Sequence, residues 1–128
     1  MLEPSIIVSD IDYIRLMALP SPPELRAELE RAIVVPSESI NPAIVGMHSL
    51  VLYRDEVSEQ LREIEVVYPD EADPASGKVS VFAPVGAALI GLRVGESIDW
   101  DFPDGSLRRL CVVAVKPPPT AADAASPH

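Results

Sequence analysis

The stretch APVGAALIGLRVGESIDWDFPDGSLRRLCVVAV, residues 83–115, contains the pattern that decides the fold. Its first part predicts a short helix, because Pro84 suits the first helical position and the apolar residues Ala87, Leu89 and Ile90 follow it. Gly91 then provides a stop, since glycine adopts the left-handed conformation that commonly ends a helix. The sequence therefore predicts one short helix that begins beside Pro84 and ends before Gly91.

The second part of the same stretch predicts a β-hairpin. Residues 97–102 alternate strictly between apolar and acidic or polar side chains, which indicates a strand with one buried face. A Pro-Asp-Gly turn follows within residues 102–106, and the apolar run of residues 107–115 returns as the final strand. In this hairpin we expect Arg108 or Arg109 opposite Asp101, with the register open by one residue. The expected inward residues are Ile98, Trp100 and Phe102.

Upstream of this stretch, three further segments have the two-residue period of strands. They are residues 46–55, 60–69 and 78–82, with a loop at 70–77. The middle segment is the clearest, because apolar and acidic side chains alternate along it. Its apolar face is Ile64, Val66 and Tyr68, and its polar face is Glu63 and Glu65. Together with the hairpin, these segments predict an α+β fold in which one short helix covers a five-stranded antiparallel sheet.

Two short helices are predicted before residue 40. The first begins after Ser9, which can cap it, and ends at Leu19 before a proline. The second begins with a capping box, in which Ser21 is followed three residues later by Glu24, and Pro22 takes the first helical position. Each helix is expected to span about ten to twelve residues, roughly 15–18 Å, and the tight turn between them predicts an antiparallel helix hairpin. The expected inward residues are Ile11, Ile14, Ala18, Leu25, Leu29, Ala32 and Ile33.

The length of 128 residues fits one domain, or one small domain with an appendage. We predict a helix hairpin at residues 1–40, a sheet domain at 41–116 and a tail at 117–128. The tail, PPPTAADAASPH, has no apolar periodicity and is expected to be disordered.

Composition excludes several classes of function. The formal net charge of −10 argues against direct binding to nucleic acid or to an acidic membrane surface. The single cysteine, Cys111, permits no internal disulfide and is expected to be buried and unreactive. No apolar run reaches the length of a membrane span, and no signal peptide is visible at the N-terminus. We therefore expect a cytoplasmic protein.

The residue types most often used in catalysis do not form a recognised constellation in this sequence. His48 has no nucleophile or metal partner at a diagnostic spacing, so a half-buried structural histidine is expected. The acids at positions 10 and 12 are explained as partners of a helix dipole, and those of 70–73 as solvated loop residues. The glycines between residues 86 and 95 lack the lysine of a phosphate-binding loop. The residues alone thus predict a binding module that is not an enzyme and holds no metal or cofactor.

Residues 83–100 also resemble the signature of the bacterial transcription elongation factors GreA and GreB. In that family a Ser-Pro-x-Gly-x-Ala-Leu-Ile-Gly run precedes an acidic Val-Gly-Asp/Glu turn and a strand. Here Ala83 replaces the usual serine. The matching residues are Pro84, Gly86, Ala88, Leu89, Ile90, Gly91, Val94 and Gly95. The resemblance to the Rnk branch of the family, the "regulator of nucleoside diphosphate kinase" proteins, extends over residues 5–116.

The resemblance implies an FKBP-like fold for the C-terminal domain and a function in transcription regulation. Gre factors place this domain on the rim of the RNA polymerase secondary channel, and acids at the tip of their long N-terminal coiled coil help to hold a catalytic magnesium ion. RNA polymerase is therefore the expected partner, with nucleic acid contacted only through it, and the chain is expected to be a monomer. The expected docking residues are Ala83, Pro84, Val85 and Gly86.

The predicted N-terminal hairpin departs from the Gre pattern because it is short. Its expected tip, residues 19–24, contains Ser21 and a single carboxylate, Glu24. One acid on a short arm cannot reproduce a paired-carboxylate magnesium site, so we expect competition with Gre factors without stimulation of transcript cleavage. Two alternatives stay open. One is an FKBP-like peptidyl-prolyl isomerase, and the other is a regulator that acts through nucleoside diphosphate kinase rather than through polymerase.

Overall fold

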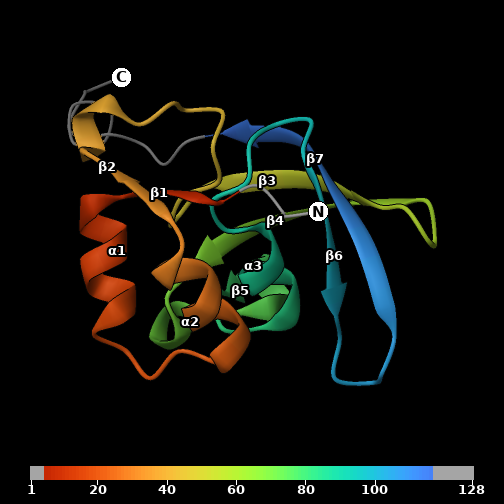
Figure 1. Ribbon diagram of the computed structural model, residues 1–128. Helices are drawn as coiled ribbons and strands as arrows, with labels where there is room; N and C mark the ends of the chain where they lie inside the picture. The colour runs from red at the N-terminus through yellow and green to blue at the C-terminus, as the bar shows by residue number, and fades with distance from the viewer. Residues whose placement is uncertain (1–4, 117–128) are drawn as a thin grey trace.

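The computed structural model describes residues 5–116, and its main element is a curled five-stranded sheet (Figure 1). The strand order is β5-β4-β3-β7-β6. The bounds are β3 Leu50–Asp55, β4 Gln60–Val67, β5 Lys78–Ser80, β6 Ser97–Asp101 and β7 Leu107–Lys116. One short helix, α3 (Pro84–Leu89), connects the two edge strands and packs on the sheet. The α+β class and the five strands predicted for this sheet are confirmed.

The sheet is mixed rather than fully antiparallel, because β5 runs parallel to its neighbour β4. The segment between these strands contains two short 3₁₀ turns, Pro69–Glu71 and Pro74–Ser76. These turns bring the chain back along β4, so that Lys78 lies beside Glu65. The chain reverses once more at residues 73–78, where Asp73 and Lys78 exchange backbone hydrogen bonds of 2.9 and 3.0 Å, so β5 leaves the loop in the same direction as β4. The prediction of an antiparallel sheet is therefore wrong at this edge strand.

Strands β6 and β7 form the predicted hairpin in a different register. Asp101 lies opposite Leu107, and Asp99 lies opposite Arg109 with 3.1 Å between Oδ1 and Nη1. Neither Arg108 nor Arg109 faces Asp101, because the turn closes with a hydrogen bond from the Phe102 N–H to the Ser106 carbonyl. The predicted alternation holds in β6. Ile98 is buried, Trp100 and Phe102 are half-buried, and Asp99 and Asp101 are exposed.

The N-terminal part contains a parallel strand pair with two helices between its strands. The bounds are β1 Ile7–Ser9, α1 Asp10–Met17, α2 Pro23–Glu30 and β2 Ile33–Val35. As predicted, Ser9 caps α1, and its hydroxyl accepts a hydrogen bond of 3.0 Å from the Asp12 N–H. Each helix has eight residues, about 12 Å, and is therefore shorter than predicted. Ile33, expected on a helix face, instead begins β2 opposite Ile7.

The predicted capping box at Ser21 does not form. Helix α2 has Pro22 as its N-cap and begins at Pro23. The Ser21 hydroxyl instead donates a hydrogen bond of 3.0 Å to the Leu16 carbonyl, at the end of α1. Since proline has no N–H, Pro23 removes one of the donors that a cap would satisfy. Glu24 is consequently an exposed residue of the first turn of α2.

One hydrophobic core joins the N-terminal helices to the sheet. Leu16, Leu25 and Leu29 are fully buried in the cluster that also contains Val51 and Val112 of the sheet. Both helices lie against the sheet domain (Figure 1), and no separate antiparallel hairpin stands away from it in the described residues. The boundary at residue 40 stays a prediction, and the expected tail lies outside the described residues.

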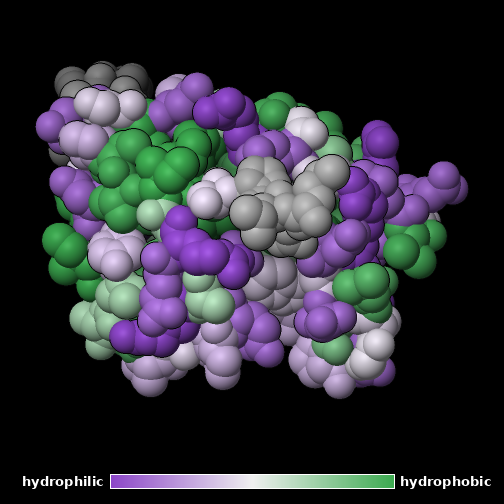
Figure 2. Space-filling model, viewed as in Figure 1, coloured by the Kyte–Doolittle hydropathy of each residue, from purple (hydrophilic) through white to green (hydrophobic). Residues whose placement is uncertain are grey.

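The buried face of α1 differs from the predicted one. Ile11 and Ile14 are 48% and 67% exposed, whereas Leu16 is fully buried and Tyr13 and Met17 pack against the core. Residues 13, 16 and 17 have helical spacing, so the inward stripe is displaced around the helix axis from the predicted one. Figure 2 shows an apolar area over the β1–β2 pair, where Ile33 and Val34 are among the exposed large hydrophobic residues.

Two further sequence expectations concern burial and membranes. Cys111 is half-buried in β7 rather than buried, because the neighbouring Leu110 and Val112 take the positions that face the core. None of the helices in the described part of the chain is long and apolar enough to cross a membrane.

Candidate partner-docking surface

The predicted docking residues lie where the chain turns from β5 into α3. The Ala83 N–H donates a hydrogen bond of 2.9 Å to the Ser80 carbonyl, and the Ala83 carbonyl accepts one of 2.8 Å from the Ala87 N–H. These two bonds fix the turn at the helix start, where Pro84 occupies the first helical position. Ala83, Pro84 and Val85 are each half-buried, so part of every one of these side chains is open to solvent.

Gly86, the fourth predicted residue, faces the interior. It is buried, and a Cβ atom at this position would lie 2.3 Å from the Ser80 carbonyl oxygen. Such a contact is far shorter than real Cβ atoms show, so only glycine lets α3 approach β5 this closely. Gly86 thus positions the turn by internal packing, and the accessible residues of the turn are Ala83, Pro84 and Val85.

A hollow of about 410 Å³ brings the predicted arm tip and the docking turn together. Pro22 and Glu24 of the N-terminal part line one side, and Pro84 and Trp100 line the other. We call it the tip hollow. It lies between α2 and the β6–β7 hairpin, where Figure 2 shows an indentation at the lower edge of the molecule. Ser21 does not line this hollow, because its hydroxyl is turned toward the end of α1.

A second hollow, of about 640 Å³, lies on the other side of Pro84 and is called here the sheet hollow. Its apolar lining includes Val85, Ile64 and Phe102. The buried ring of Tyr53 also lines it, and burial raises the pKa of the Tyr53 hydroxyl. Pro84 is therefore a ridge between two hollows, each with apolar walls.

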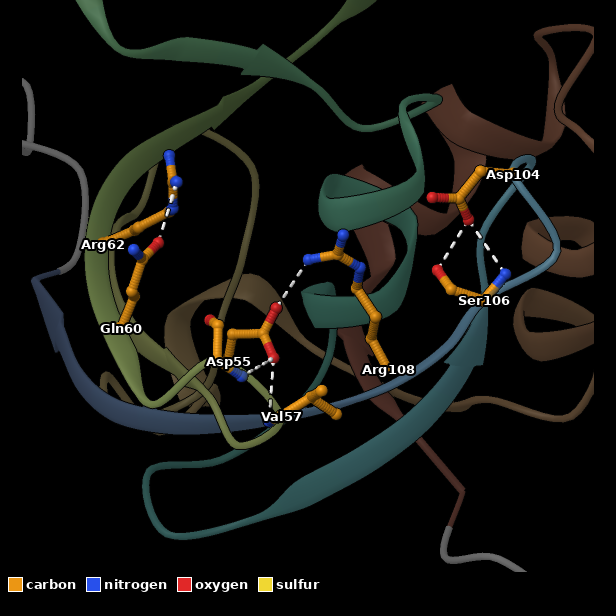
Figure 3. Close-up of polar contacts among 8 residues, drawn as sticks. Asp55, Val57, Gln60, Arg62, Asp104, Ser106 and Arg108 are labelled. Carbon is orange, nitrogen blue, oxygen red and sulfur yellow. Dashed lines mark hydrogen bonds and ion pairs between the residues drawn. The ribbon is translucent and has the colours of Figure 1, made fainter.

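An ion pair supports the wall that these two hollows share. The carboxylate of Asp55 in β3 accepts hydrogen bonds from Arg108 at 2.7 Å and from the Val57 N–H at 2.9 Å (Figure 3). The Arg108 guanidinium also lies 5.1 Å from the centroid of the Phe102 ring. Burial raises the pKa of Asp55, but the hydrogen bonds from Arg108 and from the backbone outweigh this effect and hold the pKa below its usual value. Phe102, which lines both hollows, is thus fixed by a charged partner.

A third hollow, of about 780 Å³, adjoins the tip hollow through Phe82 and is called the loop hollow. Beside Phe82 it is lined by the 18–20 linker, His48, Tyr68 and Glu71. His48 Nε2 lies 2.8 Å from Glu71 Oε1, and the His48 backbone is left-handed with φ 67°. The hydrogen bond from His48 lowers the pKa of Glu71. Glu71 therefore holds the side chain of a residue in the left-handed region, which is uncommon outside glycine although histidine adopts it more often than most residues.

Sequence reasoning did not identify Phe82 as a residue of the site. It was assigned only to the end of a strand, yet the structure leaves it half-buried between the tip and loop hollows. The available signal was an aromatic residue directly before a helix start, at the end of a short strand. Because Phe82 follows the last paired residue of an edge strand, its ring is left partly open to solvent.

The acids at positions 10 and 12 serve as hydrogen-bond acceptors. Asp10 accepts from the hydroxyl and the N–H of Ser37 at 2.8 and 3.1 Å, and these bonds lower its pKa. Asp12 accepts from the Met47 N–H at 3.1 Å. Within residues 5–116 no group of three or more His, Cys, Asp or Glu is arranged to hold a metal ion.

Comparisons with known proteins agree with this architecture. Residues 40–117 match the family "Transcription elongation factor, GreA/GreB, C-term". The "Regulator of nucleoside diphosphate kinase" of Escherichia coli K12 is 37% identical over 131 residues, which cover 95% of this chain and 96% of the relative. GreA of Thermodesulfovibrio yellowstonii is 44% identical over 75 residues, and the match covers 59% of this chain and 48% of that protein.

A solved structure gives the same result. The structure described as "Prokaryotic transcription elongation factor GreA/GreB from Nitrosomonas europaea" is similar with a TM-score of 0.70 and 40% identity, covering 89% of this chain and 99% of that one. The similarity thus includes the N-terminal helices as well as the sheet. The chain belongs to the GreA/GreB family of transcription elongation factors and, within it, is a homologue of the Rnk proteins, the regulators of nucleoside diphosphate kinase.

Proposed function

We propose that this protein is a transcription regulator that binds RNA polymerase at the rim of the secondary channel and competes there with GreA and GreB. Family membership supports polymerase as the partner. The observation that carries the proposal is the turn of Ala83, Pro84 and Val85, whose side chains are half-exposed. Pro84 at its centre has an apolar hollow on each side, and the three residues are together called the docking ridge. Such a ridge offers a partner both a protruding contact and recesses for its own side chains.

The protein binds without stimulating transcript cleavage, and it is not itself an enzyme. Its two N-terminal helices are eight residues long and are anchored in the core by Leu16, Leu25 and Leu29. An arm of this kind has neither the length nor the freedom to enter a channel. The segment between the helices and the first turn of α2 carry one carboxylate, Glu24, whereas the family's magnesium site requires paired acids.

The proposal is tested by direct binding and by one matched pair of variants. The purified chain is titrated against core polymerase, and we expect a micromolar or tighter dissociation constant. Val85→Asp combined with Pro84→Ala should weaken binding by more than about 100-fold, because a charge would be desolvated in an apolar contact. Ile33→Asp is the control, since Ile33 is 53% exposed, begins β2 and lines neither the tip hollow nor the sheet hollow.

Two results would contradict the proposal. One is failure of the wild-type chain to bind polymerase at micromolar concentration. The other is equal binding by the ridge variant and the Ile33→Asp control. Circular dichroism and the unfolding midpoint must show that both variants remain folded, because a loss of structure would also abolish binding.

Neither alternative is favoured by a specific observation. A prolyl isomerase needs a pocket lined by several aromatic side chains. The sheet hollow is lined by two, Tyr53 and Phe102, and the tip hollow by three, Phe82, Trp100 and Phe102, but the tip hollow also carries the exposed carboxylates of Glu24 and Asp101. A proline-isomer assay with turnover above background would revive that alternative. Co-purification with nucleoside diphosphate kinase but not with polymerase would favour the other.

A further inference from the structure

We propose that the tip and loop hollows together form one docking groove for a basic, amphipathic segment of the polymerase, with Phe82 as its central apolar contact. This inference rests on the proposed function and states the chemistry of the partner. It also extends the docking surface beyond residues 83–86 to the N-terminal linker and the first turn of α2.

The floor of the groove is apolar where the two hollows meet. Phe82 is half-buried and lines both hollows, so it is the contact that they share. Leu19 and Pro20 extend the apolar lining on the loop side, and Pro84 and Trp100 extend it on the tip side. An aromatic ring at the centre of such a depression is the type of residue that dominates binding energy in protein interfaces.

The edges of the groove are acidic. Glu24 from α2 and Asp101 from β6 both line the tip hollow, and both are exposed. Asp70 lines the loop hollow and is also exposed. Within residues 5–116 these three carboxylates make no side-chain hydrogen bond or ion pair, in contrast to Asp55, which is held by Arg108.

Charge complementarity therefore selects the partner. Among the described residues, Arg15 is the only arginine or lysine that lines either hollow, and His48 of the loop hollow is already paired with Glu71. No basic residue in the described chain lines the tip hollow, where two carboxylates face the same space from different elements. A lysine or arginine of the partner can neutralise both, while an apolar neighbour packs on Phe82. The net charge of −10 would also favour the approach of a basic segment.

The experiment measures the salt dependence of binding to core polymerase. Glu24→Gln combined with Asp101→Asn removes two charges from the tip hollow. Glu38→Gln combined with Glu59→Gln is the control, because these two residues are also exposed but line neither hollow. The groove variant should bind about three- to ten-fold more weakly at 50 mM salt, with the difference vanishing near 0.5 M salt, because rim charges are screened. Phe82→Ala should weaken binding by about ten-fold or more at both salt concentrations.

The outcomes separate this inference from the proposed function. If polymerase binds but the groove variant behaves as the Glu38/Glu59 control, the inference is wrong and the proposed function stands. If the wild-type chain does not bind polymerase, both are wrong. Glu24→Gln and Asp101→Asn alter exposed side chains that have no partner, so we expect both variants to remain folded. Phe82 is half-buried, so the unfolding midpoint of the Phe82→Ala variant must be measured together with its binding.

Discussion

Gly86→Ala tests the packing that positions the docking ridge. The added Cβ atom would lie 2.3 Å from the Ser80 carbonyl oxygen and 3.0 Å from the Ser80 carbonyl carbon and the Val81 Cα. All three are backbone atoms, so no side chain can move aside and α3 must shift away from β5. Overpacking of this severity costs about 3 kcal/mol. Alanine is favoured over glycine within a helix by about 1 kcal/mol, which leaves a net destabilisation of about 2 kcal/mol.

The assay is chemical denaturation at neutral pH together with polymerase binding. Gly46→Ala is the matched control, because its Cβ would lie 3.4 Å from the nearest atom, Asp12 Oδ2, which is an ordinary contact. We expect Gly86→Ala to lower the free energy of unfolding by about 2 kcal/mol and the control by less than about 1 kcal/mol. It should also weaken polymerase binding, since the shift of α3 moves Pro84. Equal stability of Gly86→Ala and wild type would refute the assignment of Gly86 to internal packing.

Two further predictions concern stability. Leu29→Ala should lower the free energy of unfolding by about 2–5 kcal/mol because Leu29 is fully buried, and Ile14→Ala, at a position 67% exposed, should change it by less than about 0.5 kcal/mol. Equal effects would show that α2 does not share the core. Asp55→Asn should cost about 2 kcal/mol at pH 7, because Arg108 loses its charged partner. The pKa of Asp55 is lowered in the folded chain, so this stability is present above about pH 4 and is lost as pH falls further. Denaturation at pH 7 and pH 3 should therefore show wild type and variant converging at the lower pH, and a constant difference would contradict the ion-pair account.

The parts of the fold that sequence predicted are those fixed by local chemistry. Pro84 and Gly91 mark the helix between them, and α3 occupies that interval. The alternation in residues 97–102 and the Pro-Asp-Gly turn predicted the β6–β7 hairpin, although not its register. In these segments each residue's preference agrees with its final environment, so a pattern of short range is sufficient.

The errors occurred where distant segments decide the structure. Ile33 continues the helical spacing of Leu25 and Leu29, but pairing with Ile7 in β1 places it in a strand. Ile11 and Ile14 fit a helical stripe as well as Leu16 does, and only contact with the sheet selects Leu16 for burial. Such choices depend on tertiary packing, which periodicity alone does not contain.

The candidate site was predictable in part for the same reason. The turn at residues 83–86 was predicted because these residues stand together in the family signature that the sequence resembles. The nearness of Glu24 to this turn follows from the packing of α2 beside α3, and the role of Phe82 follows from the two hollows that it separates. The support of Phe102 by Asp55 and Arg108 depends on the register of β3 and β7, which contains a bulge between Leu52 and Tyr53.

Competition for the polymerase tests the central claim most directly. Backtracked elongation complexes are incubated with a fixed concentration of GreB, and cleavage of the nascent RNA is measured while this protein is titrated in. We predict that cleavage falls to the level seen without GreB, that the protein alone stimulates no cleavage, and that the Pro84→Ala/Val85→Asp variant leaves GreB activity intact. Undiminished GreB-dependent cleavage at concentrations where this protein saturates polymerase would contradict a shared docking site, and cleavage stimulated by the protein alone would contradict the account of its short, core-anchored helices.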